Sequence, residues 1–238
     1  PGIKQVGVFD TAFHQTMPKE AFLYALPLEQ YTKYKIRRYG FHGTSHAYVT
    51  AKAAELIGKK GKIITCHLGN GASISAIDNG KCLATSMGFT PLAGLVMGTR
   101  CGDIDPYIPL DICKSQNKTP DEVNEILNKR SGMFGLCGYS DNRDVETLFG
   151  VEEKATDAMN AYIHSIIRFI GSYIAVLGGV DAIVFTAGIG ENGSLVRKLV
   201  LERLQYLGIT LDEEANNRRG NIEEISTPDS QVRVFVIP

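Results

Sequence analysis

Apolar residues recur every three or four positions in several segments of the chain, which is the spacing of one face of an α-helix. The longest such segment covers residues 152–177, and a second covers residues 44–57. A third helix is expected to run to about residue 129 from Thr119-Pro120-Asp121-Glu122, which combines an N-cap, a proline at the first helical position and acidic residues near the positive end of the dipole. A fourth is expected over residues 194–207.

Short apolar runs rich in β-branched residues predict strands between these helices. Within residues 73–77, Ser73, Ser75 and Ile77 alternate with Ile74 and Ala76. The tetrapeptide at 78–81, Asp-Asn-Gly-Lys, is a strong hairpin signal. The expected strands are residues 62–66, 73–77, 82–85, 182–186 and 232–237. Strands that alternate with helices indicate a layered α/β fold, and the hairpin makes the sheet mixed rather than purely parallel.

Composition excludes several classes of protein. The 238 residues are 44% hydrophobic and 21% charged, with a formal net charge of −1, so there is no general basic field for nucleic acid. No apolar stretch is long enough to span a bilayer, and the start does not resemble a signal peptide. The five cysteines are an odd number without a CxxC spacing, which disfavours a zinc site or a disulfide framework and fits a reducing cytoplasm.

Two glycine turns follow predicted strands. The first is His67-Leu68-Gly69-Asn70-Gly71, and the second is Gly188-Ile189-Gly190-Glu191-Asn192, which precedes a predicted helix. Glycine lets backbone N–H groups approach phosphate oxygens closely, and a helix N-terminus adds partial positive charge. A tight corner between strand and helix also needs glycine, so one turn would be weak support. Two such turns favour a nucleotide cleft.

Four polar clusters offer candidate chemistry, and each also has an ordinary structural interpretation. Asp10 lies among aromatic and small residues and could be a turn or cap residue. His42 and His46 stand at the start of a predicted helix and could serve as cap and packing residues. Arg100 lies between glycines and could hold a loop together. The charged turn at 141–144, Asp-Asn-Arg-Asp, could be a surface ion pair that contributes little.

These clusters resemble the motifs of the acetate kinase family, in the family's order and over essentially the whole chain. The matching segments are Phe-Asp-Thr-Ala-Phe-His, Phe-His-Gly-Thr-Ser-His, His-Leu-Gly-Asn-Gly, Ser-Met-Gly-Phe-Thr-Pro-Leu, Gly-Thr-Arg-Cys-Gly and Phe-Thr-Ala-Gly-Ile-Gly-Glu-Asn. The resemblance implies a ribonuclease H-like α/β fold of the actin, Hsp70 and sugar kinase superfamily, with a mixed sheet flanked by helices.

The resemblance also implies site residues. The phosphate-binding hairpin would be His67, Leu68, Gly69, Asn70 and Gly71. The adenosine-side loop would be Asp141, Asn142 and Arg143, where relatives often have Phe in the middle, and the turn under the nucleotide would be Gly188, Ile189, Gly190, Glu191 and Asn192. Asp10, His42 and Arg100 match the catalytic residues, and Phe41 and Pro91 match part of the acetate pocket.

The implied reaction is reversible transfer of the γ-phosphoryl group of ATP to acetate, with Mg²⁺, to give acetyl phosphate and ADP. Acetate is already ionised at neutral pH, so the site has to bring two anions together rather than generate a nucleophile. Arg100 would stabilise the phosphoryl oxygens, His42 would donate a hydrogen bond there, and Asp10 would orient Arg100 or the water around the metal. The alternatives are a propionate or butyrate kinase and a non-catalytic actin-like module, which would not require these three residues.

The resemblance implies a domain assignment as well. The family's amino-terminal domain contributes another phosphate loop and a substrate arginine, and a glutamate associated with Mg²⁺ follows the last strand. None of these has a counterpart here. Residues 1–238 are therefore expected to be the carboxy-terminal nucleotide-binding domain of a longer two-domain kinase. This domain alone is expected to bind nucleotide without turnover, and the resemblance implies a homodimer.

Overall fold

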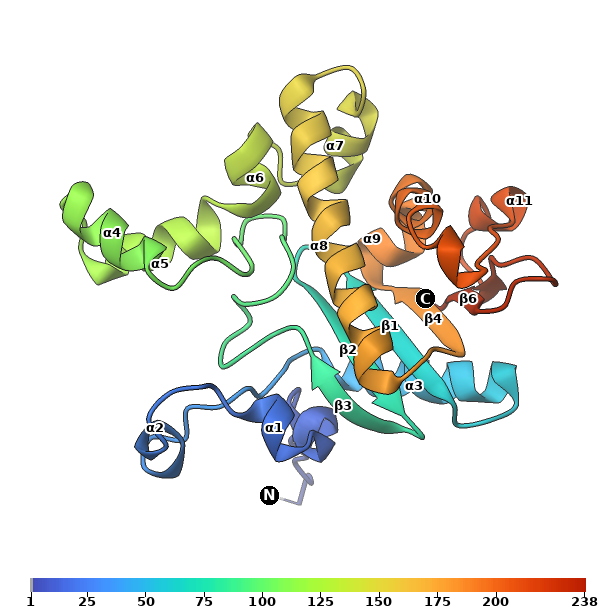
Figure 1. Ribbon diagram of the computed structural model, residues 1–238, viewed down its shortest axis with the longest axis horizontal. Coiled ribbons are helices and arrows are strands. Elements are labelled where there is room, and N and C mark those ends of the chain that lie inside the picture. The colour runs from blue at the N-terminus through green and yellow to red at the C-terminus, as the bar shows by residue number, and fades with distance from the viewer. Residues whose placement is uncertain (1) are drawn as a thin grey trace.

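A six-stranded mixed sheet forms the centre of the computed structural model, which describes residues 2–238 (Figure 1). Its strands are β1 (Lys62–Leu68), β2 (Ala72–Asp78), β3 (Lys81–Thr85), β4 (Ala182–Thr186), β5 (Glu223–Glu224) and β6 (Arg233–Val236), in the order β3-β2-β1-β4-β6-β5. The strands β1, β4 and β6 are parallel, whereas β2, β3 and β5 each pair antiparallel with a neighbour. The predicted mixed sheet is confirmed.

The turn between β2 and β3 follows the sequence signal directly. Asn79 and Gly80 both have positive φ, 50° and 82°, which is the conformation of a type I′ turn. Such a turn matches the twist of the two strands it joins, so the Asn-Gly pair sets the register in which Asp78 lies opposite Lys81.

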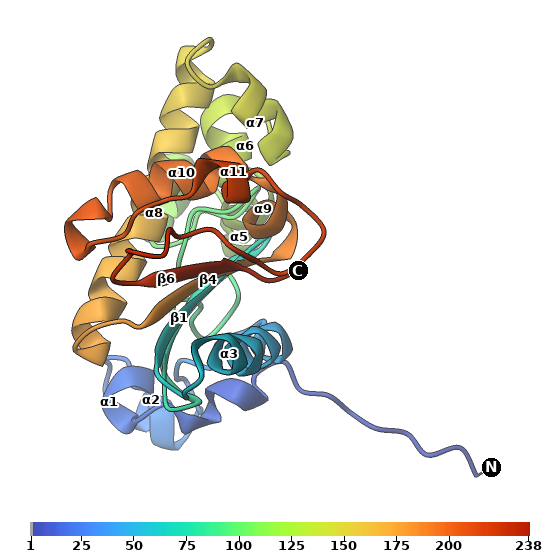
Figure 2. The same cartoon turned by 90° about the vertical axis from the view of Figure 1, so that its right-hand side faces the viewer.

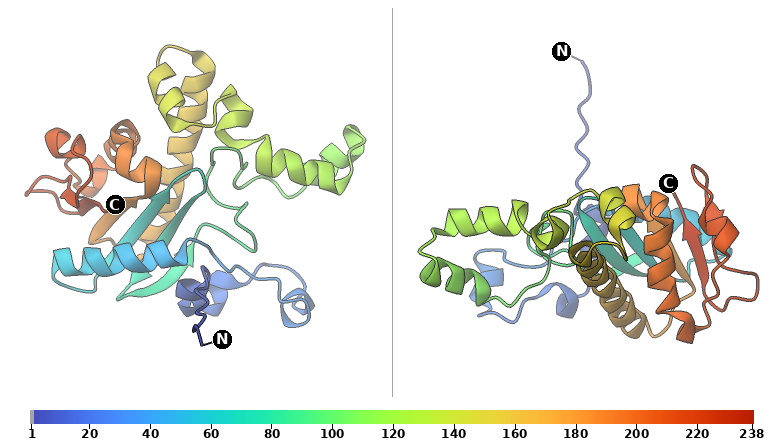
Figure 3. Two further views of the ribbon diagram at one scale, coloured as in Figure 1. Left: turned by 180° about the vertical axis from the view of Figure 1, so that it is seen from behind. Right: turned by 90° about the horizontal axis from the view of Figure 1, so that it is seen from above.

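Two helices cover opposite faces of the sheet. Helix α8 (Glu153–Leu177) crosses one face, and α3 (Gly43–Ile57) lies on the other (Figures 2 and 3). Alternate residues of β1 and β2 divide accordingly: Ile64 and Ile74 belong to the core under α8, whereas Ile63 and Ile77 pack with Val49 on the α3 side. Burial of both faces explains why these strands are apolar on both sides, as is typical of sheets with helices on each face.

The remaining helices lie around this three-layer centre. They are η1 (Ala12–Thr16), α1 (Lys19–Phe22), α2 (Glu29–Thr32), α4 (Ile108–Ser115), α5 (Pro120–Lys129), α6 (Gly132–Cys137), α7 (Asn142–Leu148), α9 (Ala187–Asn192), α10 (Ser194–Glu202), η2 (Gln205–Leu207) and α11 (Glu213–Asn216). The predicted start of α5 is confirmed, because Thr119 and Glu122 form a reciprocal capping box. Helices α4 and α5 project away from the sheet (Figure 1).

Two expectations about the segment after β4 are wrong. Residues 188–192 do not form an open turn, because they lie in the short helix α9. The helix that begins at Ser194 ends at Glu202 rather than near residue 207. There the hydrogen bonds tighten, since Leu204 N donates to Leu201 O and Leu207 N donates to Leu204 O, and a 3₁₀ turn follows.

Two further expectations concern membranes and disulfides. Among residues 2–238, none of the helices combines the length and the hydrophobicity needed to cross a bilayer. All five cysteines have free thiols, as the odd count and the spacing predicted. Burial raises the pKa of the Cys82 thiol to about 12, so this thiol stays protonated and unreactive.

Candidate active site

The parallel pairing of β1 with β4 brings the two predicted glycine segments to the same edge of the sheet. His67 lies opposite Thr186, so both strands end side by side. After β1 the chain turns through Gly69-Asn70-Gly71 into β2, with Gly69 N donating to Gly71 O. After β4 it enters α9 directly. Sites in α/β sheets are usually found at the carboxyl ends of parallel strands.

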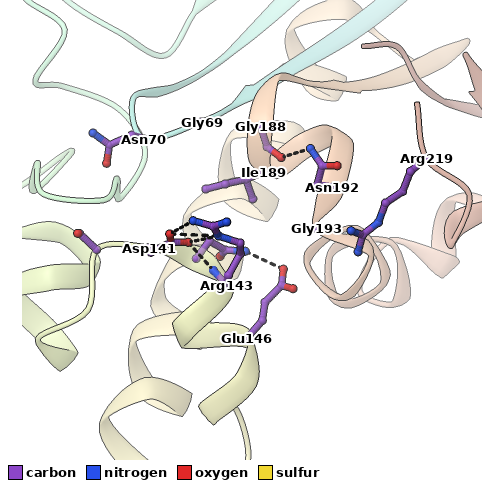
Figure 4. Close-up of a pocket in the computed structure, with 12 residues that line it drawn as sticks. Gly69, Asn70, Asp141, Arg143, Glu146, Gly188, Ile189, Asn192, Gly193 and Arg219 are labelled. Carbon is purple, nitrogen blue, oxygen red and sulfur yellow. Dashed lines mark hydrogen bonds and ion pairs between the residues drawn. The ribbon is translucent and has the colours of Figure 1, made fainter. Parts of the chain in front are cut away.

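A cavity of about 690 Å³ opens at this edge (Figure 4). It is lined by three predicted segments together with neighbouring polar residues: Gly69, Asn70, Ser140, Asp141, Asn142, Arg143, Glu146, Gly188, Ile189, Asn192, Gly193 and Arg219. The first two segments are 70 residues apart in sequence (Asn70 to Ser140), and the second and third are 42 residues apart (Glu146 to Gly188). The cavity therefore assembles the hairpin after β1, the start of α7 and the helix α9 around one space.

Five predicted nucleotide residues do not line this cavity. Leu68 is fully buried in the core, and Gly190 is buried on the side of α9 that faces Leu68 and Phe185. The Glu191 backbone carbonyl is turned inward to a buried arginine. His67 lies among other histidines, and Gly71 faces His42 and Arg100 rather than the cavity. These residues shape the segments that the cavity presents.

The start of α7 forms one wall of the cavity. Asp141 caps the helix by accepting a hydrogen bond from Arg143 N (2.9 Å) and also pairs with the Arg143 guanidinium, which lowers the Asp141 pKa to about 2. Both side chains are largely exposed, so the pair contributes little to stability. Behind them Asn142 donates to Glu146 (2.7 Å, Figure 4). Burial raises the pKa of Glu146.

A buried arginine supports the opposite wall. Arg197 of α10 is 1% exposed and donates to the backbone carbonyls of Gly190 (2.8 Å) and Glu191 (2.7 Å). It also donates to the side chain and the carbonyl of Asn216, and burial lowers its pKa to about 10. These bonds satisfy the otherwise unpaired carbonyls at the end of α9 and tie that helix to α10 and α11.

The predicted catalytic residues His42 and Arg100 meet at the hairpin. A Cβ atom built on Gly71 would lie 3.3 Å from Arg100 Nη2 and 3.5 Å from His42 Nε2. Arg100 is held by donating to the Pro91 carbonyl (2.8 Å). The approach at Gly98 is much closer, since a Cβ there would collide with the Asn70 amide oxygen. Glycine is therefore needed at position 98 to bring the arginine loop against the hairpin, whereas a Cβ on Gly71 would press on the ends of the Arg100 and His42 side chains.

Asp10 contacts His42 rather than Arg100. Its carboxylate accepts a hydrogen bond from His42 N (2.7 Å), and its carbonyl accepts from Gly43 N. His42 precedes α3 with φ 57°, a left-handed conformation that is rare for a residue with a side chain. The Asp10 carboxylate therefore stabilises a strained backbone conformation that turns the His42 ring toward Gly71.

Four histidines gather behind this point. The rings of His42 and His67 stack at 4.0 Å with 17° between their planes, and His46 and His14 lie beneath them. Burial lowers the pKa of all four rings, to about 4 for His67 and well below the usual range for His46, which is fully buried. The cluster is neutral at pH 7, so it adds no net positive charge to Arg100.

The two residues expected in the acetate pocket each contact a residue of this arrangement through a backbone carbonyl. Phe41 is half-buried against the main core, and its carbonyl accepts a hydrogen bond from His14 Nε2 (2.9 Å). Pro91 is exposed, and its contact with Arg100 is made by the backbone carbonyl. Each is thus connected to a residue of the site.

No group of three or more His, Cys, Asp or Glu side chains among residues 2–238 is arranged to hold a metal ion. Mg²⁺ is usually bound by one or two carboxylates together with substrate phosphates rather than by a cage of protein ligands. The exposed Asp10 carboxylate beside His42 fits that mode.

Sequence reasoning missed several residues of the site. Glu146 and Arg219 line the cavity, but nothing in their local sequence distinguishes them from surface charges. Arg197 falls within a helical pattern and shows no motif. The family resemblance assigns no role to His46, although its i, i+4 spacing from His42 places both rings on one helix face.

Replacing Gly71 with alanine is expected to lower the kcat of the complete protein about tenfold or more, with little change in its affinity for ADP. The new methyl group would fill the space between Arg100 and His42 without touching the cavity, and Gly71 does not require a positive φ. Steady-state kinetics and ADP titration test this. Gly171→Ala is the matched control, because a Cβ on that helical glycine meets nothing within 4 Å. Equal effects of the two changes would contradict the assignment of Arg100 and His42 as catalytic residues.

The histidine cluster predicts that stability falls with acidification. Because all four pKa values are lowered in the folded state, the unfolded chain binds more protons below about pH 6.5, at up to ~1.4 kcal/mol per pH unit for each histidine. Glu146, whose pKa is raised, acts with the opposite sign near the carboxylate range. Urea unfolding at pH 7.5, 6.5 and 5.5 should show a decreasing free energy of unfolding.

The control for this series is His164→Gln, since His164 is exposed on α8 and outside the cluster. This variant should retain the full dependence on pH. A free energy of unfolding that is constant or rises between pH 7.5 and 5.5 would contradict the neutral buried cluster.

Comparisons with known proteins agree with this geometry. The Acetokinase family model matches residues 1–238. The chain is 58% identical over 243 residues to acetate kinase of Dictyoglomus thermophilum and 53% identical to that of Clostridioides difficile, covering 100% of this chain and 61% of each relative.

Solved structures give the same result for the fold. The crystal structure of Porphyromonas gingivalis acetate kinase matches with a TM-score of 0.96 at 48% identity, covering 100% of this chain and 61% of that one. A propionate kinase from Francisella tularensis matches with a TM-score of 0.92 at 43% identity, covering 97% and 60%. The chain has the fold of the actin, Hsp70 and sugar kinase superfamily, and it spans about three fifths of the length of these relatives. With its whole described length matched, the chain belongs to the acetokinase family.

Proposed function

We propose that the protein containing this chain is an ATP:acetate phosphotransferase, which reversibly transfers the γ-phosphoryl group of ATP to acetate to give acetyl phosphate and ADP. The observation that carries this proposal is the convergence of three polar segments on a cavity of about 690 Å³, with Arg100 and His42 adjoining it across Gly71. The acetate kinase relatives support the choice of acceptor.

In this proposal, the cavity takes the nucleotide. Asp141, Asn142 and Arg143 face the adenosine from α7, and Gly188, Ile189 and Asn192 face it from α9. Gly69 and Asn70 lie toward the phosphates, where hairpin N–H groups suit anionic oxygens. Adenosine bound between α7 and α9 would direct the γ-phosphoryl group of ATP toward Gly71.

The chemistry is then electrostatic. The guanidinium of Arg100 has the Pro91 carbonyl and the Met97 sulfur as partners, and both are uncharged, so its positive charge is available to the transferred group. His42 is neutral at pH 7 and has Nε2 on the Gly71 side, from which an N–H can donate to a phosphoryl oxygen. Acetate would lie near Phe41 and Pro91.

Mg²⁺ would enter with the nucleotide and neutralise phosphate charge. Asp10 is the carboxylate of this chain placed to orient its bound water, while also holding His42. We further propose that residues 1–238 form the carboxy-terminal domain of a two-domain cytoplasmic kinase that acts as a homodimer. The share of its relatives that the chain covers supports the domain assignment.

Trapping of the acyl phosphate with hydroxylamine tests the proposal. The complete protein, ATP and Mg²⁺ should yield acetyl hydroxamate, and acetate should be preferred over propionate and butyrate. A methylene changes binding by only ~1–3 kcal/mol, so some activity on propionate is expected. Preference for propionate would favour the function named for the Francisella tularensis relative instead. Nucleotide binding without any acyl phosphate would support a non-catalytic module.

A further inference from the structure

A chain of hydrogen bonds runs from His42 into the core of the protein. His42 Nδ1 lies 2.8 Å from Ser73 Oγ, and the same oxygen lies 2.7 Å from His46 Nε2. His46 Nδ1 in turn lies 2.7 Å from Thr65 Oγ1. The three inner residues are 0% exposed, whereas His42 is half-buried at the site.

The position of this chain in the fold is unusual for polar groups. Thr65 and Ser73 lie on the face of β1 and β2 that α3 covers, a face that is apolar at Ile63 and Ile77. Burying hydroxyl and imidazole groups costs free energy unless each finds a partner. Every polar side-chain atom of the three inner residues has one in the described structure. This chain of hydrogen bonds lies within the core except at its outer end, which is His42.

Each of the three bonds needs one hydrogen, and a neutral His46 carries a single N–H. Three arrangements meet this count. In the first, Thr65 donates to His46 Nδ1, His46 Nε2 donates to Ser73, and Ser73 donates to His42 Nδ1. In the second, all three directions are reversed, so His42 Nδ1 donates to Ser73 and His46 Nδ1 donates to Thr65. The third differs from the first only in that His42 Nδ1 donates to Ser73, which then accepts twice. Only the first gives both hydroxyl hydrogens an acceptor within these bonds, and His46 stays neutral in all three.

The first arrangement suits the proposed site. With Nδ1 accepting from Ser73, a neutral His42 must carry its hydrogen on Nε2, the atom that faces Gly71 and Arg100. The second suits an imidazolium, which donates from both nitrogens. The charged and titratable groups around His42 are Asp10, Arg100, His14, His46 and the stacked His67. Only the chain through Ser73 fixes which nitrogen bears the hydrogen.

We propose that Ser73, anchored by His46 and Thr65, is a positioning residue that holds His42 in the tautomer with hydrogen on Nε2 and aims that N–H at the transferred group. The expected effect of Ser73 on turnover rests on the proposed function. Its structural part, the tautomer, stands independently of the reaction.

The test combines kinetics with ¹⁵N NMR of the histidine rings. Ser73→Ala should lower kcat about 10- to 100-fold, with the KM values for acetate and ATP changed by less than about threefold. Ser73→Thr, which retains the hydroxyl, should restore most of the rate. The matched control is Ser75→Ala. Ser75 is equally buried on the same strand face, but it bonds to Thr85 (2.9 Å), which is not part of the hydrogen-bond chain of His42.

The NMR measurement needs no substrate. In the wild-type protein at neutral pH, His42 should show a protonated Nε2 and an acceptor Nδ1, and Ser73→Ala should replace this by a mixture of tautomers. A wild-type His42 protonated on Nδ1 would overturn the proposal, as would equal kinetic losses in Ser73→Ala and Ser75→Ala. If the tautomer is as expected but no acyl phosphate forms, the proposed function fails while the assignment of Ser73 stands.

Discussion

Replacing Arg100 with alanine in the complete protein is expected to lower kcat by about a thousandfold or more and to change the affinity for ATP by less than about threefold. The guanidinium faces Gly71 and is oriented by the Pro91 carbonyl, at the far side of the hairpin from the cavity. It does not line the cavity proposed for adenosine. In the proposed reaction, the charge of Arg100 would therefore stabilise the transferred phosphoryl group more than the bound nucleotide.

Steady-state kinetics and calorimetric titration with ATP separate these two effects. Arg100→Lys should recover only part of the rate, because an ammonium retains the charge but lacks the planar fork. Arg168→Ala is the control, since that arginine is exposed and pairs with Asp103 on the surface. Unchanged turnover in Arg100→Ala would remove Arg100 from the catalytic residues.

The 238-residue chain by itself is expected to bind ADP weakly and to form no measurable acetyl phosphate. The residues that line the cavity all belong to this chain, so it contains the proposed nucleotide site. Asp10 and Pro91 are exposed, however, and water at the site would weaken the interactions of Arg100 and His42. In the proposed two-domain kinase, this chain alone would also lack the second domain's positioning of the two substrates, which can contribute ~7–11 kcal/mol.

Calorimetry with ADP and a hydroxamate assay on the purified chain test both parts. The complete protein is the positive control for turnover. The variant Gly193→Val, which alters the cavity wall, tests whether the bound ADP occupies the cavity. Robust acetyl phosphate formation by the chain alone would show that the catalytic parts are misplaced. Absence of ADP binding would show that the cavity is not a nucleotide site.

Much of the fold could be predicted because its signals are local. The apolar stripe of α8, the Asn79-Gly80 turn and the capping box at Thr119 each depend on residues a few positions apart. The sequence pattern does not predict α4 and α6 because both helices are short, and α6 contains Gly132 and Gly135. The glycines of α9 predict a turn rather than a helix. In the structure, Arg197 donates hydrogen bonds to the Gly190 and Glu191 carbonyls, which allows a helix there.

The site was predictable only in part, for a physical reason. Glycines after two strands become neighbours because β1 and β4 pair in parallel. The sequence pattern indicated a mixed sheet but not which of its strands are neighbours. The hydrogen-bond chain through Ser73, His46 and Thr65 depends on the register of β1 with β2 and on the rotation of α3 above these strands. A buried serine in an alternating strand gives no local sign of such a contact.

A crystal structure of the protein with ADP bound tests the central claim most directly, namely that the cavity at the ends of β1 and β4 is the nucleotide site of a phosphotransferase. The account predicts adenosine between α7 and α9, with its phosphates along Gly69 and Asn70 and the terminal one directed toward Arg100 and His42. ADP bound elsewhere, or bound here with its phosphates pointing away from Gly71, would contradict it.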